Sequence, residues 1–389
     1  MTPVSLPSQG SMFLGAYRIA ASLNDCVVLV HGPSGCHFGP NFFEVLTNNL
    51  SSNATVSVMR ERSVVYGGIE NLEKAIRLTR KHYKNKRIIV LSSHVPAIIG
   101  DDLEFVDADI YFDCGGFQPM WQGIEAFLGR LGDFICENGH KEEAPTNLVN
   151  LIGFQRDVVG AEEDLEELKR VLSFSDVKVN VIPDSLECLR YARYASLNIV
   201  FGYGVKLARR MKREFGIPYI VTDHPYGVEG LKEFIEKLGE NFEFEHDINK
   251  DVFGEIHEKL KRYRNNLPLF YDVPVCVVGD LPRISGMSKF LERELGMNVE
   301  LAFATSSAMK EFDFNVPCTK FVESYSEFIE EIKGLDIKVL LGTDEERRII
   351  NNTIVFAFPS FTRMSYVPYL GKGTLNLIAD IYERLMGWI

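Results

Sequence analysis

Short apolar runs alternate with amphipathic stretches along the whole chain, and glycine or polar turns separate them. The apolar runs lack polar alternation, which is typical of strands buried on both faces of a parallel sheet. The amphipathic stretches repeat apolar residues at helical spacing; in the last one, 374–386, Ile378, Ile381 and Leu385 share one face. Strands that alternate with helices in this way predict a doubly wound α/β fold.

The same pattern predicts the individual elements. We expect strands at 27–30, 55–59, 87–91, 110–112, 148–152, 177–182, 197–201, 219–221, 275–279, 299–303, 339–342 and 354–357. We expect helices at 11–23, 70–83, 101–105, 122–132, 162–172, 204–215, 252–265, 285–295, 325–333 and 374–386. These elements fall into three successive series of similar architecture.

The length of the chain implies more than one domain. A chain of 389 residues is too long for a single core, and domains of about 100–200 residues predict two or three. A polar break at 137–145 follows the first series, and the third series starts after Pro268. We therefore expect three doubly wound, Rossmann-like domains at 1–145, 146–268 and 269–389.

Composition and charge narrow the class of protein. The net charge of −12 argues against nucleic-acid binding, which relies on clustered lysines and arginines. The one basic run, 77–87, is interpreted as the solvated end of a helix, with a docking patch as the alternative. No apolar stretch approaches the roughly 20 residues that span a bilayer, and the first residues lack an export signal. Seven cysteines without a disulfide-like framework fit a reducing compartment, so we expect a cytoplasmic protein.

Cys36 follows the apolar strand 27–30 at the tip of a glycine-containing turn. Ligands collect beyond the carboxyl ends of strands in open α/β sheets, so this position suits binding. A phosphate loop needs Gly-Lys-Ser or Gly-Lys-Thr at its end, whereas this chain has Gly35, Cys36 and His37, which excludes a nucleotide site in this turn. Two interpretations remain open for Cys36: a packing thiol and a ligand of a metal cluster.

Acidic and imidazole groups also follow predicted strands. Asp101 and Asp102 are interpreted as caps of the helix expected at 101–105, with general-acid chemistry as the alternative. Asp223 and His224 follow a strand of the second series and are our candidates for substrate protonation.

The remaining cysteines show no paired spacing. Cys114 follows the strand 110–112 and therefore shares a sheet edge with Cys36, so it is a candidate spare ligand. Four further cysteines are interpreted as packing residues because they lack the spacing of metal-binding pairs: Cys136, Cys188, Cys276 and Cys318.

Three loops, taken in order, carry a resemblance to a known family. Their sequences are HGPSGC at 31–36, ERSVVYGG at 61–68 and IIGDD at 98–102. Together with segments at 114–117 and 369–377, they resemble the nitrogenase component 1 family, which includes nitrogenase subunits, dark-operative protochlorophyllide reductase and the nickel-sirohydrochlorin diamide reductive cyclase. The resemblance covers nearly the whole chain and implies three α/β domains.

The resemblance also implies a cofactor and partners. In that family a pair of similar subunits holds an iron–sulfur cluster between their first domains, and a separate ATP-hydrolysing reductase delivers electrons. It therefore implies a [4Fe–4S] cluster shared at a subunit interface, in a homodimer or in a heteromer with a component 1-like paralogue. ATP and magnesium belong to the partner, a nitrogenase reductase-like iron protein that docks transiently.

The family's site residues carry over one by one. Cys36 matches a cluster ligand, and the same loops assign Gly35, Gly67 and Gly68 to the cofactor site. Cys36 is the one cluster cysteine of the family's pattern that this chain keeps. The resemblance therefore favours the interpretation of Cys36 as a metal ligand over that of a packing thiol.

Two positions depart from the family's pattern. Ser11 stands where nitrogenase subunits have a cluster cysteine, and it is interpreted mainly as a helix N-cap. His94 stands where nitrogenase and the cyclase have a cysteine; it is either a structural residue or a ligand that raises the reduction potential of the cluster. Three arrangements remain open: two Cys36 and two His94 in a homodimer, one Cys36 beside three ligands from a paralogue, and loss of the cluster.

A third departure concerns the substrate. The cysteine that helps nitrogenase to hold its molybdenum–iron cofactor aligns with Gly202, so dinitrogen reduction is not expected. A glycine-lined space at this point suits a flat macrocycle or another organic substrate, as in the tetrapyrrole reductases. The alternative is simple packing, because Gly204 permits a following helix to approach closely.

The leading functional hypothesis is a catalytic-component subunit of a nitrogenase-like reductase, acting on a small organic or tetrapyrrole-like substrate. One alternative is a scaffold that resembles the nitrogenase cofactor maturases, or a cluster-free support subunit without turnover. Another is an unrelated sugar- or nucleotide-binding α/β protein in which the loop matches are accidental.

Overall fold

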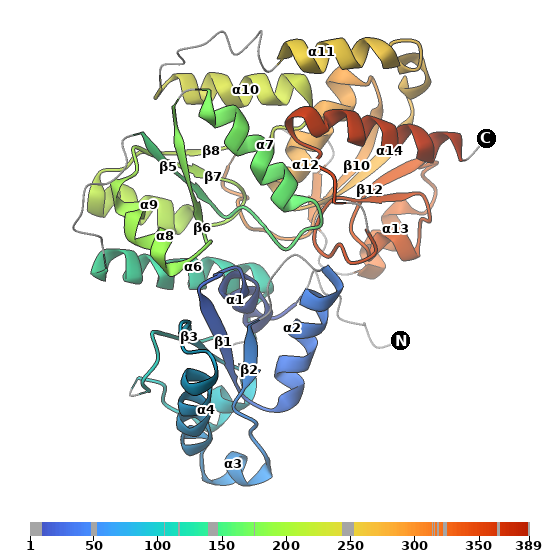
Figure 1. Cartoon of the computed structure of the whole chain (residues 1–389). Coiled ribbons are helices and arrows are strands. Elements are labelled where there is room, and N and C mark those ends of the chain that lie inside the picture. Colours follow the sequence, from blue (N-terminus) through green and yellow to red (C-terminus); the bar gives the residue numbers. More distant parts are fainter. Residues whose placement is uncertain are drawn as a thin grey trace.

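Three parallel β-sheets with helices packed on them make up the molecule (Figure 1). The computed structural model describes residues 10–47, 53–104, 106–115, 117–138, 147–174, 176–242, 253–312, 314, 316, 319–321, 325–363 and 366–387. Each sheet is formed by one of the three series predicted from the sequence. The predicted doubly wound α/β fold is therefore confirmed, while the domain boundaries at 145 and 268 stay predictions.

The first sheet has the strand order β2-β1-β3-β4. Its central strands, β1 and β3, are apolar and almost entirely buried, as parallel strands covered on both faces require. The elements of this part are β1 (Cys26–His31), β2 (Ala54–Val56), β3 (Arg87–Ser92) and β4 (Ile110–Asp113), with α1 (Met12–Ala21), α2 (Ser34–Thr47), α3 (Glu61–Tyr66), α4 (Ile69–His82), α5 (His94–Ile99) and α6 (Met120–Glu137).

The second sheet has the order β6-β5-β7-β8 and the third the order β11-β10-β9-β12-β13. The second part comprises β5 (Leu148–Ile152), β6 (Lys178–Ile182), β7 (Leu197–Val200) and β8 (Tyr219–Val221), with α7 (Ala161–Ser173), α8 (Leu186–Tyr191), α9 (Val205–Phe215) and α10 (Gly227–Gly239). The third comprises β9 (Pro274–Gly279), β10 (Asn298–Ala304), β11 (Thr319–Phe321), β12 (Val339–Gly342) and β13 (Thr353–Val355), with α11 (Gly254–Leu260), α12 (Leu281–Lys289), α13 (Tyr325–Ile332) and α14 (Thr374–Met386).

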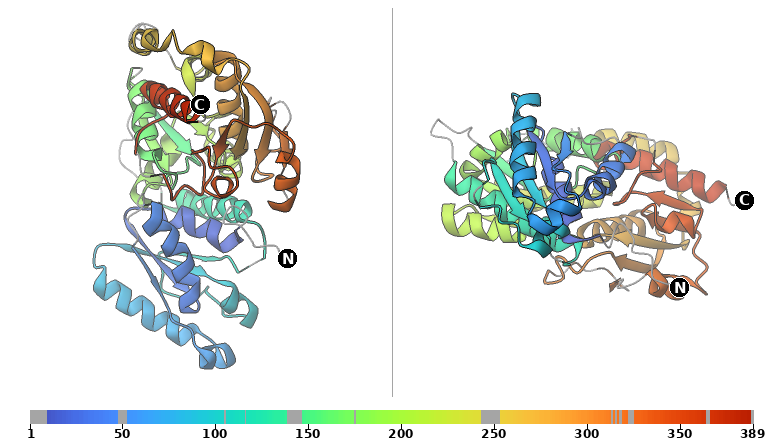
Figure 2. Two further views of the ribbon diagram at one scale, coloured as in Figure 1. Left: turned by 90° about the vertical axis from the view of Figure 1, so that its right-hand side faces the viewer. Right: turned by 90° about the horizontal axis from the view of Figure 1, so that it is seen from below.

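Helix α6 joins the first part of the molecule to the second (Figure 2). It packs on α1 from one side and on α9 from the other. Its crossing with α1 is tight because a Cβ on Gly15 would lie 2.0 Å from the Met120 carbonyl oxygen, and a Cβ on Gly123 would lie 2.0 Å from that of Met12. No helix of the described residues is long and apolar enough to cross a membrane.

Several elements differ from the prediction. Helix α2 was not expected because Gly35, Gly39 and Pro40 are typical of turns, and Cys36 lies in its first turn rather than at the tip of a loop. Helices α3 and α5 have six residues each, too few for a periodic pattern, and α10 and β11 were not predicted either. The helix expected at 101–105 is wrong: Gly100, with φ +76°, ends α5, and the described residues that follow are not helical.

A buried arginine joins the three parts. Arg18 of α1 binds Asp157 through Nε, and its Nη2 donates to Asp157 Oδ1 at 2.9 Å and to Gln155 Oε1 at 3.0 Å. Its guanidinium lies 3.5 Å from the ring centroid of Phe358, which belongs to the third part. Gln155 in turn donates to Asp280 at 2.9 Å. This group, which we call the junction network, therefore connects all three sheets.

We expect Arg18→Ala to lower the free energy of unfolding by about 3–5 kcal/mol, because it leaves the Asp157 carboxylate buried without its partner. Urea denaturation followed by circular dichroism measures the change. Arg213→Ala is the matched control, since the Arg213 side chain is 72% exposed and its ion pair with Glu214 should contribute less than about 1 kcal/mol. Equal losses in the two variants would contradict the role of the junction network.

Candidate functional site

The site is built where the two central strands of the first sheet end. His31 of β1 pairs with Ser92 of β3, so the segments that follow the two strands start side by side. A Cβ on Gly32 would lie 2.1 Å from Ser93 Oγ and 3.7 Å from Cys36 Cβ, so the glycine is needed for the close approach of the two segments. The structure thus places Cys36, in the first turn of α2, beside the start of α5.

His94 is the first residue of α5 and is half-buried. Its ring lies between two aromatic rings, with centroids 6.5 Å from that of Phe13 in α1 and 5.4 Å from that of Phe117 after β4. The Phe117 side chain is 83% exposed, so the imidazole stands at the surface rather than in the core. Cys36 and His94 therefore belong to one exposed edge of the sheet.

Ser11 occupies the N-cap position of α1, as predicted, but its side chain makes no capping hydrogen bond. Instead its backbone forms a bridge with Pro119, and the Met12 N–H donates to the Gln118 carbonyl at 2.7 Å. The ring of Phe13, two residues on, approaches His94. The starts of α1, α2 and α5 therefore converge on the same edge.

Two side chains at this edge are of types that bind metal clusters. A thiolate and an imidazole are both ligands of iron–sulfur clusters. A Cβ on Gly35 would meet nothing within 4 Å, so the space beside Cys36 is open, and the buried Ser93 Oγ nearby has no hydrogen-bond partner among the described residues. Nowhere in the described part of the chain do three or more potential ligands gather around one point. The residues fit a cluster only as part of a site completed by another chain.

A chain of hydrogen bonds holds the Cys36 turn from behind. The Gly32 N–H donates to Ser57 Oγ at 3.1 Å, and Ser57 Oγ lies 2.9 Å from His31 Nδ1. His31 Nε2 lies 3.1 Å from Asp101. Burial lowers the pKa of His31, so it is neutral and donates from Nε2 to the carboxylate. We call this group the loop network.

Asp101 connects the loop network to the remaining motif. Its carboxylate accepts the Gly68 N–H at 3.0 Å, just before α4 begins. A Cβ on Gly68 would lie 2.6 Å from Asp101 Oδ2 and 2.9 Å from His31 Cε1, so only glycine fits. Asp101 therefore binds the residue before α4 and begins no helix of its own, and Asp102 accepts the Glu104 N–H within a turn. That Gly67 and Gly68 also contact a cofactor stays a prediction.

The comparisons with known proteins agree with these motifs. A model of the family described as nitrogenase component 1 type oxidoreductase matches residues 11–386. The chain belongs to this family. The expected resemblance is thus confirmed over almost the whole chain.

Curated relatives and a solved structure are similar to the chain along most of its length. The component 1 chain is 25% identical to a subunit of the light-independent protochlorophyllide reductase of Angiopteris evecta, over 95% of this chain and 81% of that protein. It is also 25% identical to the corresponding protein of Gloeothece citriformis, over 96% and 81%. The solved structure of nitrogenase Cp1 at pH 6.5 superposes with a TM-score of 0.81 at 19% identity, covering 100% of this chain and 94% of that one, which supports the fold.

Cys114 is a packing thiol in this component 1 chain. It is fully buried, and its Sγ donates to the Ser92 carbonyl at 2.8 Å. Burial raises its pKa well above the usual value, which favours the thiol over the metal-binding thiolate. Among the other predicted packing residues, Cys276 is buried, Cys136 and Cys188 are half-buried, and Cys318 lies outside the described residues.

Asp223 and His224 lie far along the chain from Cys36, beside the third sheet. His224 is buried between the rings of Phe154 and Phe201, with centroids 5.7 and 5.4 Å away. Asp223 forms an ion pair with Lys289, and the cavity beside these residues holds about 10 Å³, room for one water molecule. Their role in substrate protonation stays a prediction.

The space at Gly202 is also occupied. A Cβ on this glycine would lie 3.6 Å from Asp280 Oδ1 and 3.8 Å from Pro282, both from the third part of the chain. A Cβ on Gly204 would lie 2.4 Å from Cγ2 of Ile152, and the Gly204 N–H donates to Glu125 at 2.6 Å. This arrangement is the packing alternative, and it leaves no space for a macrocycle against Gly202.

Sequence reasoning missed the junction and loop networks. Arg18, Asp157 and Ser57 belong to no motif, and their partners are 26 to 139 residues away in sequence. The place of Arg18 among the apolar residues of the predicted helix 11–23 was the available signal, because a charge within an apolar stretch needs a partner.

The loop network predicts energetic coupling between His31 and Asp101. A double-mutant cycle with His31→Gln and Asp101→Asn should give a coupling of about 1–3 kcal/mol in the free energy of unfolding, since each change leaves a buried partner unsatisfied. The same cycle with Asp102→Asn is the control and should give a value near zero, because Asp102 is exposed. Chemical denaturation of the variants measures both cycles, and equal couplings would refute the network.

His224 predicts a dependence of stability on pH. Burial and the nearby Arg283 hold the pKa of His224 well below its usual 6.5, so the unfolded chain binds the proton more readily than the folded one. The contribution of the neutral, buried His224 to the free energy of unfolding is therefore complete above pH 6.5. It is lost as the pH falls from 6.5 toward the pKa that His224 has in the folded chain. Between pH 7.5 and pH 5.5 the free energy of unfolding should fall less for His224→Phe than for the wild type, and denaturation curves at the two pH values measure this. His82→Gln, an exposed control, should behave as the wild type.

Proposed function

We propose that this chain is a catalytic-component subunit of a two-component, nitrogenase-like reductase. It holds a [4Fe–4S] cluster at Cys36 together with a second component 1-like subunit and receives electrons from an ATP-hydrolysing iron protein. Its substrate is a small organic or tetrapyrrole-like molecule, and its compartment is the cytoplasm. The observation that carries the proposal is an accessible thiol, Cys36, on an exposed edge with only part of a ligand set beside it in the described part of the chain.

The ligand count requires a second subunit. A [4Fe–4S] cluster takes four protein ligands. One chain offers Cys36 and His94, so two copies complete the set, and a paralogue with three ligands completes it with Cys36 alone. When bound, the cluster stores one electron at a time, and imidazole ligation raises its potential. The relatives are named as one subunit of a reductase, which supports an assembly with a different chain.

Exposed apolar side chains at the same edge support a subunit interface. Phe38 is 69% exposed, Ile98 70% and Phe117 83%, and each closely follows Cys36, His94 or Cys114 in the sequence. Apolar surface gathered in this way is typical of interaction sites. A second subunit that buries these side chains would also exclude water from the cluster.

Helix α3 is our candidate for the docking surface of the iron protein. Its Val65 and Tyr66 are 72% and 82% exposed. Two residues after Tyr66 in the sequence, Gly68 donates its N–H to Asp101 of the loop network, which holds the Cys36 turn. A protein docked on α3 therefore lies against the segment that positions the proposed ligand.

The substrate follows from the relatives, whose names specify protochlorophyllide, a tetrapyrrole. Asp223 and His224 are kept as the proposed proton donors. Because the cavity beside them has room for one water molecule, that role requires the second and third parts of the chain to move apart.

The test is the iron and acid-labile sulfide content of protein purified without oxygen, alone and with a co-encoded component 1-like partner. We expect about four irons per pair of chains in the wild type and none in Cys36→Ala. Cys188→Ala is the matched control, since this half-buried thiol belongs to α8 of the second part. His94→Ala separates the two arrangements: loss of iron indicates a homodimeric ligand set, and retention indicates ligands from a paralogue.

Three outcomes would overturn the proposal. Iron that is absent from every wild-type preparation would favour a cluster-free support subunit. Iron that is present but unchanged in Cys36→Ala would move the cluster to another part of the chain. Bound cluster without ATP-dependent reduction of any tetrapyrrole in the presence of the iron protein would favour the scaffold.

A further inference from the structure

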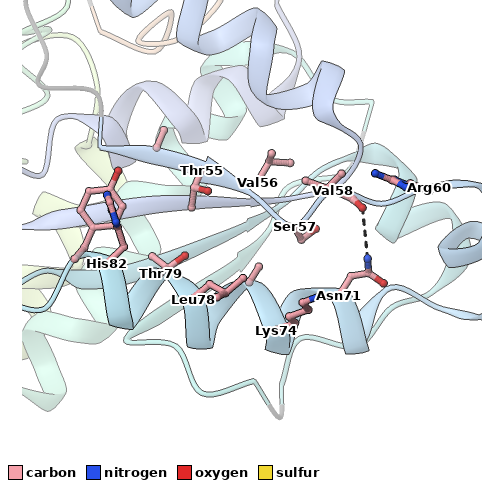
Figure 3. Close-up of a pocket in the computed structure, with 13 residues that line it drawn as sticks. Thr55, Val56, Ser57, Val58, Arg60, Asn71, Lys74, Leu78, Thr79 and His82 are labelled. Carbon is pink, nitrogen blue, oxygen red and sulfur yellow. Dashed lines mark hydrogen bonds between the residues drawn. The ribbon is translucent and has the colours of Figure 1, made fainter.

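A groove of about 700 Å³ runs between β2 and α4 (Figure 3). One wall is the face of α4 that carries Asn71, Lys74, Ala75, Leu78 and His82, and the other is the strand β2 with the residues that follow it. β2 is the edge strand of its sheet, so no further strand of the described residues covers this side. A volume of this size is in the range of small-molecule sites.

The charge of the groove is opposite to that of the protein. Its lining includes Arg60, Lys74 and His82 and no carboxylate, in a chain with a net charge of −12. Within the described residues neither Arg60 nor Lys74 forms an ion pair. Two cations that form no ion pair in the described part of the chain, in a lining without a carboxylate, favour an anionic ligand.

The two ends of the groove differ chemically. Arg60, Asn71 and Lys74 lie toward one end, and His82 lies at the other (Figure 3). The rings of His82 and Tyr83 are in edge contact there, with centroids 4.7 Å apart. At about 1.5 Å per residue of helix, Asn71 and His82 are about 16 Å apart along α4. A ligand that uses both ends is therefore elongated, with a charged end and a planar end.

The groove also provides hydrogen-bonding groups along its length. The hydroxyls of Thr55 and Thr79 line it. Ser57 donates its N–H to Val30 of β1, so in the alternation of a parallel ladder the N–H and C=O of Val56 point away from β1, toward the open edge. These groups suit the sugar hydroxyls or linking oxygens of a nucleotide.

We propose that this groove is a binding site for a nucleoside diphosphate or triphosphate. Arg60 and Lys74 bind the phosphates, and the base lies against His82 and Tyr83. The site is separate from the proposed cluster site, but Ser57 belongs both to the groove and to the loop network behind Cys36. The inference does not depend on the proposed function, because it rests on lining residues that hold no cluster.

Isothermal titration calorimetry of the full chain with ADP, pyrophosphate, adenosine and citrate tests the proposal. We expect ADP to bind at least tenfold more tightly than each of the other three, because it alone uses both ends of the groove. Binding should weaken as salt rises, since the phosphate contacts are screened. Citrate or pyrophosphate binding as tightly as ADP would overturn the proposal, as would no ADP binding at 1 mM.

Three variants locate the binding in the groove. Lys74→Ala should weaken ADP at least fivefold, and Ala75→Leu, which adds bulk to the wall and changes no charge, should weaken it to a similar degree. Lys81→Ala is the matched control: Lys81 is exposed on the same helix, does not line the groove, and should leave the affinity unchanged. Circular dichroism checks that each variant is folded. Equal effects of Lys74→Ala and Lys81→Ala would overturn the proposal.

Discussion

The buried side chain of Arg18 connects the proposed site to the rest of the molecule. Helix α1 is only ten residues long, yet its start carries Phe13, which contacts the ring of His94, and its end carries Arg18. The guanidinium binds Asp157 of the second part and stacks on Phe358 of the third. The position of the Cys36 edge relative to the other two sheets therefore depends on this ionic contact together with the packing of α6 on α1 and α9.

A polar junction has consequences that an apolar one would not have. Buried charges are costly to remove from water and are stable only while every partner is in place, so the junction network accepts few relative positions of the three parts. An apolar interface of the same size tolerates sliding more readily. In this conformation Asp280 and Pro282 fill the space beside Gly202, where a substrate was expected. Access to that space requires the polar contacts to rearrange together.

At the start of α1, in contrast to the junction network, the proposed cluster site is incomplete within one chain. Cys36 is accessible, the space beside Gly35 is open, and large apolar side chains surround the edge. The loop network nevertheless holds the Cys36 turn firmly, because its members are hydrogen-bonded to one another in sequence: Gly32 to Ser57, Ser57 to His31, His31 to Asp101 and Asp101 to Gly68. A site shared between two chains needs a turn that is rigid and whose binding group is still free. A side chain that is already held in position loses little entropy when it binds.

The sequence by itself determined the fold class and most strands, because apolar runs without alternation are a local signal of buried parallel strands. It also identified the motif loops, whereas Cys36, expected at the tip of a turn, lies in the first turn of α2. Only the tertiary structure decided how those loops act. Asp101 was expected to cap its own helix, but it binds Gly68 just before α4 and His31, which is 70 residues away in the sequence. The burial of single residues in the loops was likewise not visible in the pattern, so the sequence could not show that Cys114 is a packing thiol or that His224 is enclosed. Helices α3 and α5 escaped prediction because six residues are too few for a period, and tertiary contacts, not local propensity, stabilise them.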